Sequence, residues 1–115
     1  MKPEGRLTSK LDIEAPQARE NREALRALMD AVRAEEDVIR QGGGAKAAEA
    51  QKAKGRLTVR ERLKLLLDVD SGFLELGLWA AHGMYTEYGG APSAGVVTGL
   101  GRVSGRLCMI VANDA

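Results

Sequence analysis

The chain has 115 residues, of which 44% are hydrophobic, and a formal net charge of +1 at pH 7. Because neither sign is in excess, the composition argues against binding of nucleic acid or membrane by the whole surface, and any anion site must be local. The single cysteine excludes a disulfide framework and favours a reducing compartment. Residues 1–6 lack the apolar stretch of a secretory signal, so we expect a cytoplasmic protein.

Charge is concentrated in the first part of the chain. Residues 1–72 hold 15 of the 17 Lys and Arg residues and 13 of the 16 Asp and Glu residues, whereas residues 73–115 are rich in glycine and apolar side chains. This division predicts a helical, solvated N-terminal half joined to a sheet-forming C-terminal half.

An apolar stripe marks the first expected helix, over Gln17–Arg40. Four aliphatic residues recur there at spacings near three, four and seven, the pattern of an amphipathic helix: Leu25, Leu28, Val32 and Ile39. Glu35 interrupts the stripe, which lasts only about three heptads and therefore does not favour a long coiled coil. We expect this helix to pack on its own domain or on a partner helix.

Two shorter helices are expected after a glycine-rich break at residues 41–44. Residues 45–54 are rich in Ala, Lys, Glu and Gln, the strongest helix formers, and Gly55 ends the segment. The next helix has a well-marked start, because Thr58 and Glu61 have the spacing of a capping box, in which the two side chains satisfy free backbone N–H groups. The expected buried face of this helix consists of Val59, Leu63, Leu66 and Leu67.

A local excess of positive charge lies between residues 46 and 64. Seven cationic residues stand against two anionic ones: Lys46, Lys52, Lys54, Arg56, Arg60, Arg62 and Lys64 against Glu49 and Glu61. Arg56 and Arg60 flank the start of the third expected helix, where free backbone N–H groups and the helix dipole also favour anions. The segment is therefore either a phosphate site or a solvated basic face with one or two ion pairs.

The C-terminal half is expected to begin with a turn and a short strand. Residues 68–72 have the composition of a turn, and Phe73–Leu76 alternates like a strand. Residues 79–92 are expected to form an irregular loop. His82 in this loop is a poor metal ligand or catalytic group, because no Cys, Asp or Glu stands near it at ligand spacing.

A β-hairpin is expected at the end of the chain. Ser104–Gly105 suits the two-residue turn between strands at residues 95–103 and 106–112. This turn places Gly101 opposite Cys108 and Gly99 opposite Ile110. The two glycines leave one face of the first strand nearly bare, so another backbone or a large side chain can approach closely.

The last strand, Leu107–Ala112, is apolar on both alternating faces, a pattern typical of a strand covered above and below. Within it, Cys108 is expected to be a buried, inert thiol. Such a strand normally opens a βα unit, so we expect the chain to be the opening of a larger α/β domain. We expect the isolated chain to be unstable or to aggregate, because the strand would be uncovered.

Two segments resemble the carboxyltransferase β subunits of biotin-dependent acyl-CoA carboxylases. The first segment is Lys54–Leu63 with Leu65–Asp68 and Ser71–Glu75, and the second is Gly95–Gly105 with Met109–Ala115. Both occur in the family's order and at its spacing. The second resembles most closely the methylcrotonyl-CoA carboxylase branch. The propionyl-CoA branch is less similar, because Ala112-Asn113-Asp114 stands where that branch has a Ser-Gln-Asp type ending.

The resemblance implies an α/β fold, specifically the N-terminal piece of a crotonase-like carboxyltransferase domain built from ββα units. Residues 1–44 would form a helical extension, and residues 45–115 the start of the domain. The implied enzyme transfers a carboxyl group from carboxybiotin to an acyl-CoA such as 3-methylcrotonyl-CoA, with geranyl-CoA or propionyl-CoA as alternatives. Biotin would be carried by a partner α subunit, and the β subunits would assemble into hexamers. No metal, nucleic acid or membrane is expected to bind.

The site residues implied by the resemblance are acyl-CoA contacts, with no catalytic group among them. Arg56 and Arg60 are expected to attract CoA phosphates, and Ala112 and Asn113 to line the acyl-CoA cleft where the strand ends. Alternatively, Arg60 and Arg62 only anchor their helix to the sheet. The family's oxyanion-hole donors lie beyond this stretch, so we expect it to be inactive alone. A truncated product, an anion-binding module and a helical interaction protein remain the alternatives.

Overall fold

The computed structural model of the chain describes residue 5 and residues 7–114. Residues 1–4 and 6, on which the absence of a secretory signal was predicted, and Ala115, at the end of the second family-like segment, lie outside these residues. The chain divides into two compact units, one ending at Arg33 and the other beginning at Ala34, and α1 crosses from the first into the second.

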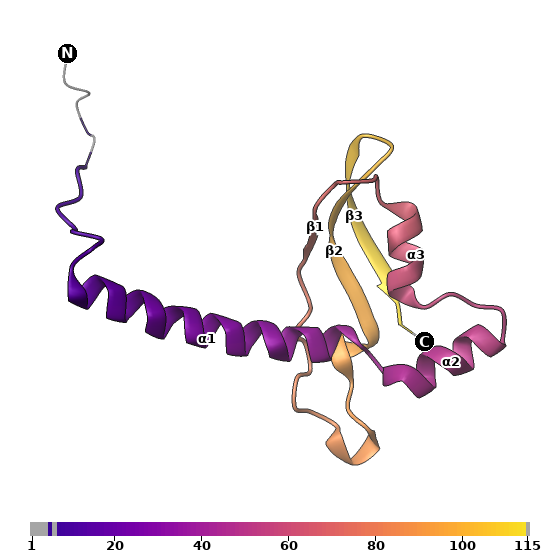
Figure 1. Ribbon diagram of the computed structural model, residues 1–115. Coiled ribbons are helices and arrows are strands. Elements are labelled where there is room, and N and C mark those ends of the chain that lie inside the picture. Colours follow the sequence, from indigo (N-terminus) through magenta and orange to yellow (C-terminus); the bar gives the residue numbers. More distant parts are fainter. Residues whose placement is uncertain (1–4, 6, 115) are drawn as a thin grey trace. The chain divides into compact units, whose positions relative to one another are not determined.

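Helices precede strands along the chain, as the sequence predicts (Figure 1). The helices are α1 (Pro16–Arg40), α2 (Gly44–Ala53) and α3 (Val59–Leu66), and the strands are β1 (Phe73–Glu75), β2 (Val96–Val103) and β3 (Arg106–Asn113). Short 3₁₀ turns at Thr86–Tyr88 and Pro92–Gly95 interrupt the loop before β2. None of the helices in the described residues is long and apolar enough to cross a membrane.

The first unit consists of the stretch before α1 and the first turns of that helix. Asp12 accepts a hydrogen bond from the Glu14 backbone N–H at 2.9 Å, and Glu14 pairs with Arg19 at 2.9 Å. These local contacts fix the chain at the start of α1. The aliphatic residues of the stripe that lie in this unit are exposed, with Leu25 at 61% and Leu28 at 66%.

The three strands form one antiparallel sheet in the order β1-β2-β3. Ser104 and Gly105 make the hairpin turn with positive φ angles of 50° and 78°, the conformation that such tight turns require. The predicted register is confirmed, since Gly101 pairs with Cys108 and Gly99 with Ile110.

The bare glycine face of β2 receives the side chains of neighbouring segments, as predicted. A Cβ atom on Gly99 would lie 2.5 Å from both the Leu74 carbonyl oxygen and the Phe73 ring. A Cβ atom on Gly101 would overlap a Leu67 methyl group. The absence of these two side chains therefore lets β1 and the residue after α3 pack directly onto the sheet.

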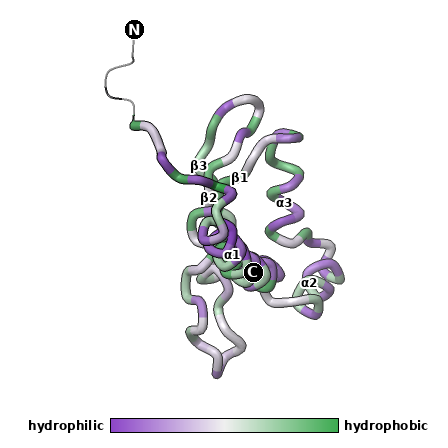
Figure 2. The backbone as a smooth tube through the Cα atoms, turned by 60° about the vertical axis from the view of Figure 1, so that its left-hand side comes forward, coloured by the Kyte–Doolittle hydropathy of each residue, from purple (hydrophilic) through white to green (hydrophobic). Residues whose placement is uncertain are grey.

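The core lies between α3 and one face of the sheet. Its buried residues are Val59, Leu63, Val97 and Ile110, with Leu67, Phe73, Val103, Cys108 and Ala112 packed against them. The prediction that Leu66 is buried is wrong, because its side chain is 50% exposed. Helix α3 ends at Leu66, and extended backbone at Leu67 turns the chain toward the sheet, so Leu67 takes the buried place instead. Figure 2 shows apolar and polar residues alternating along α3.

The opposite face of the sheet carries exposed apolar side chains. Leu74, Leu107, Met109 and Val111 are each at least 60% exposed. Within the described residues α3 covers one face of β3 and the other face is uncovered, as the sequence predicts for this strand. Cys108 lies on the covered side, where it is half-buried against the core.

Candidate functional site

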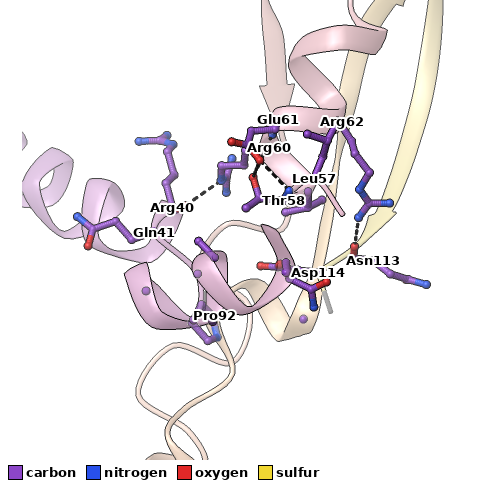
Figure 3. A pocket seen from close by; sticks show the side chains of 18 of the residues that line it. Arg40, Gln41, Leu57, Thr58, Arg60, Glu61, Arg62, Pro92, Asn113 and Asp114 are labelled. Carbon is purple, nitrogen blue, oxygen red and sulfur yellow. Dashed lines mark hydrogen bonds between the residues drawn. The ribbon is translucent and has the colours of Figure 1, made fainter. Parts of the chain in front are cut away.

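A groove of about 960 Å³ lies beside the N-terminus of α3 (Figure 3). One wall is the end of α1, the glycine turn that follows it, and α2. The opposite wall is formed by residues 56–62, and the remainder by residues 90–95 and the end of β3. All of these segments belong to the unit that begins at Ala34.

The start of α3 is closed by the capping box that the sequence predicts. The Glu61 backbone N–H donates to Thr58 Oγ1 at 3.3 Å, and the Thr58 backbone N–H donates to Glu61 Oε2 at 2.9 Å. The Thr58 backbone N–H, and next the Lys52 ammonium at 3.0 Å, lower the pKa of the Glu61 carboxyl below its ordinary value. A carboxylate of the chain thus already occupies this helix end, so a bound anion would depend mainly on arginine side chains.

Arg56 is the arginine best placed to meet a bound anion. Its side chain is exposed and lines the groove. Within the described part of the chain, its guanidinium makes no hydrogen bond or ion pair. Its backbone is held in place, because the Arg56 N–H donates to the Gln51 carbonyl at 3.0 Å. The group can therefore offer its donors to a ligand.

Arg60 lies on the same wall, but its guanidinium has partners within the chain. It donates two hydrogen bonds to the Glu75 carboxylate, at 2.9 and 3.0 Å, and Nε donates to the Arg40 carbonyl at 3.0 Å. Arg62 donates to the Asn113 carbonyl at 2.5 Å. These contacts are the ones expected of the alternative, in which both arginines anchor α3 to the sheet.

The two residues predicted at the end of β3 face different surroundings. Asn113 is exposed and lines the groove, whereas Ala112 packs against the core. The structure thus places Arg56, Arg60 and Asn113 around one groove and leaves Ala112 behind it. Their role as acyl-CoA contacts stays a prediction.

Sequence reasoning missed the contact between Asp114 and the turn after α1. The Asp114 backbone N–H donates to the Gly95 carbonyl at 2.9 Å, and its carboxylate lies 2.9 Å from the position of a Cβ on Gly42. Gly42 also has a positive φ of 59°. Three consecutive glycines at residues 42–44 were the signal for such a close approach.

The groove is lined by charged and polar groups that can bind a ligand. Its lining combines arginines and one lysine with Glu61 and Asp114, and it contains no Ser, Cys or His paired with a base. His82 lies outside the lining, 3.6 Å from Glu35 and edge-on to the Trp79 ring. No group of three potential metal ligands occurs among residues 5 and 7–114.

A family profile described as the carboxyl transferase domain matches residues 50–115, which is more than half of the chain. The chain belongs to this family. The resemblance that the two sequence segments indicated is thereby confirmed.

Relatives within the carboxyl transferase family are named as β chains or β subunits of acyl-CoA carboxylases. A probable mitochondrial methylcrotonoyl-CoA carboxylase β chain of Drosophila melanogaster is 42% identical over 95% of this chain and 19% of its own length. A biotin-dependent 3-methylcrotonyl-coenzyme A carboxylase β1 subunit of Mycobacterium tuberculosis is 53% identical over 64% of this chain and 14% of its own length.

A solved relative has the same fold over most of the chain. The β subunit of geranyl-CoA carboxylase from Pseudomonas aeruginosa superposes with a TM-score of 0.77 and 30% identity, covering 91% of this chain and 19% of that one. The likeness confirms the predicted α/β carboxyltransferase fold. In each of the three comparisons, this chain spans less than a fifth of the relative's length.

Proposed function

We propose that this chain forms the acyl-CoA-binding start of a carboxyltransferase β subunit in a biotin-dependent acyl-CoA carboxylase. The observation that carries the proposal is the carboxyl transferase match over residues 50–115, which includes the α3 wall of the groove and the hairpin. The relatives are named for acyl-CoA substrates, namely methylcrotonoyl-CoA and geranyl-CoA. A groove with an available arginine supports the same class of ligand, because CoA carries phosphates.

Within the groove, Arg56 would meet a CoA phosphate and Asn113 would contribute polar groups at the edge of β3. Arg60 and Ala112, predicted as contacts from sequence, would support the walls, because one is held by Glu75 and the other by the core. The chain itself would supply binding and orientation. Carboxybiotin, carried by a partner α subunit, would supply the CO₂ that the acyl-CoA enolate captures.

The substrate proposed for the complete enzyme is 3-methylcrotonyl-CoA, with geranyl-CoA and propionyl-CoA as alternatives. The identity of 53% to a 3-methylcrotonyl-coenzyme A carboxylase subunit supports this choice. Assembly into hexamers of β subunits beside biotin-carrying α subunits is part of the proposal. The test is carboxylation of the three acyl-CoAs by the polypeptide assembled with its biotinylated partner. Turnover of propionyl-CoA alone would show that the wrong branch was chosen.

The site is tested by titrating coenzyme A into the full-length β subunit that contains this chain and into its Arg56→Ala variant. A hydrogen bond to a charged group contributes roughly 1.5–3 kcal/mol when well formed, so losing one should weaken binding about tenfold. Arg106→Ala is the matched control, because Arg106 is also exposed and lies outside the groove lining. Equal affinities for the Arg56 variant, the control and the unaltered chain would remove Arg56 from the site.

A cytoplasmic location is proposed because the single cysteine favours a reducing compartment. The relatives do not agree with this location throughout, since the Drosophila protein is named mitochondrial and the name of the mycobacterial one gives no location. Fractionation of cells that produce the protein decides between the two locations.

A further inference from the structure

The two walls of the groove are joined mainly through polar contacts. Lys52 on α2 pairs with Glu61 on α3 at 3.0 Å, and Arg60 on α3 donates to the carbonyl of Arg40, the last residue of α1. Neither α1 nor α2 contributes a side chain to the apolar core cluster beneath α3. Apart from Ile39, which is buried at the end of α1, the separation of the walls therefore depends on a few charged groups.

The most buried of these groups is Glu75. Its side chain is 8% exposed, and both carboxylate oxygens accept hydrogen bonds from Arg60, at 2.9 and 3.0 Å. The Arg40 guanidinium lies 4.0 Å from the same carboxylate. Three elements meet here, because Arg40 ends α1, Arg60 stands in the first turn of α3, and Glu75 ends β1.

Arg60 uses both edges of its guanidinium in this arrangement. The two terminal nitrogens are directed at Glu75, and Nε is directed at the Arg40 carbonyl, one of the carbonyls that a helix C-terminus leaves without a partner. A bidentate arginine–carboxylate pair has a fixed geometry. It therefore fixes the orientation of the Arg60 guanidinium, whose Nε holds the end of α1.

We propose that Arg60 and Glu75 are positioning residues of the groove. Their ion pair holds the α1 end and the glycine turn against α3, and Arg60 does not contact the bound anion. The effect on coenzyme A rests on the proposed function, whereas the effect on the turn does not. The proposal separates the roles of two arginines on one wall: Arg56 binds, and Arg60 positions.

Neutralising Glu75 distinguishes the two roles of Arg60 by the direction of the effect. If Arg60 contacted a phosphate, Glu75→Gln would free its donors and remove a negative charge nearby, so coenzyme A would bind as well as before or more tightly. If Arg60 positions the wall, Glu75→Gln leaves a half-buried guanidinium without its counter-charge and loosens the wall. Coenzyme A should then bind about threefold more weakly or worse.

The variants are Glu75→Gln, Arg60→Ala and the exchanged pair Arg60→Glu with Glu75→Arg. All are made in the full-length β subunit that contains this chain. The two single variants should weaken coenzyme A binding to a similar extent, and the exchanged pair should recover part of the loss because it restores opposite charges. Arg106→Ala again measures the loss of a positive charge outside the groove. Unchanged or tighter binding in Glu75→Gln overturns the proposal.

Hydrogen exchange tests the position of the wall without any ligand. The Gln41, Gly42 and Gly44 backbone N–H groups donate to Val38, Ile39 and Gln41 at 3.0 to 3.1 Å and so report on the turn after α1. Both single variants should exchange faster at these amides while the amides shared by β2 and β3 keep their rates. Arg62→Ala, which removes a guanidinium bonded to Asn113 instead, should leave the turn unchanged.

The two readouts separate failure of this inference from failure of the proposed function. If the unaltered chain does not bind coenzyme A but the turn exchanges faster in both single variants, the positioning role stands and the proposed ligand is wrong. If the turn keeps its exchange rates in both variants, or loosens together with the whole hairpin, Arg60 and Glu75 have no positioning role.

Discussion

Two parts of the unit that begins at Ala34 are held together in different ways. Helix α3 and the three strands enclose side chains such as Val97, which is 1% exposed, and the glycines of β2 let them approach closely. The end of α1 and α2 meet that body through Arg60, Glu75, Lys52 and Glu61. Apolar packing depends little on pH or salt, whereas an exposed ion pair such as Lys52–Glu61 depends on both. The first part therefore maintains the fold, and the second forms the adjustable wall of the groove.

Removing a buried side chain from the apolar part has the largest expected effect on stability. Leu63→Ala removes a side chain that is 5% exposed at the centre of the α3 contact, and substitutions of this kind cost about 2–5 kcal/mol. Leu65→Ala is the control on the same helix, because Leu65 is 76% exposed. We expect chemical denaturation to show a large loss for the first variant and almost none for the second. Similar losses of stability in the two variants would mean that α3 does not pack on the sheet through Leu63.

Adding a side-chain atom to the same tightly packed part has the next largest expected effect on stability. Gly99→Ala would bring a Cβ to 2.5 Å from the Leu74 carbonyl oxygen, which belongs to the backbone and cannot rotate away. Overpacking of this kind costs about 1–3 kcal/mol. Gly72→Ala is the control, because no atom lies within 4 Å of the position of its Cβ. A Gly99 variant as stable as the control would show that β1 is not packed against β2 at this point.

The strand register and the α3 start could be predicted because each depends on a few neighbouring residues. Thr58 and Glu61 define the capping box by their spacing, and Ser104–Gly105 defines the hairpin register by its length. The burial of Leu66 could not be predicted in this way, because it depends on where α3 ends and on the close approach that Gly101 allows to Leu67.

The candidate site could be predicted only in part, since its partners come from distant parts of the chain. The structure places Arg56, Arg60 and Asn113 around one groove, and their role as acyl-CoA contacts stays a prediction. Periodicity carries no information that pairs Arg60 with Glu75, fifteen residues away, or that brings Asp114 to Gly42. Contacts of this kind become visible once the fold brings the segments together.

A charged contact between Asp68 and the hairpin turn has a smaller expected effect on stability. Both carboxylate oxygens of Asp68 accept hydrogen bonds at 2.7 Å from the hairpin backbone, one from Ser104 and one from Gly105. Asp68→Asn keeps one acceptor and should cost about 1 kcal/mol, the contribution of a typical hydrogen bond. Asp70→Asn is the control, because Asp70 is exposed and makes no side-chain hydrogen bond within the described residues. Equal thermal midpoints for Asp68→Asn and Asp70→Asn would show that the hairpin turn is stable without the Asp68 hydrogen bonds.

The smallest expected effect is a pH dependence of stability that comes from the polar part and not from the apolar part. The Thr58 backbone N–H and, next, Lys52 lower the pKa of Glu61, and Lys52 makes this contact a link between α2 and α3. A carboxyl whose pKa is lowered by folding contributes stability that is complete above its unfolded pKa, about 4.3, and is lost as pH falls through the folded pKa. The stability advantage of the unaltered chain over Glu61→Gln should therefore be present at neutral pH and disappear in acid.

Thermal midpoints of both proteins between neutral pH and about pH 3 measure this difference, since that range brackets the ordinary carboxyl pKa. Glu49→Gln is the control, an exposed carboxylate on α2 without a hydrogen bond in the described residues. The difference in thermal midpoint between Glu49→Gln and the unaltered chain should vary less with pH. Raising the salt concentration should reduce the Glu61 effect, because the pair with Lys52 is largely exposed, and should leave the loss in Leu63→Ala unchanged. If salt altered both variants equally, the division into an apolar and a polar part would not hold.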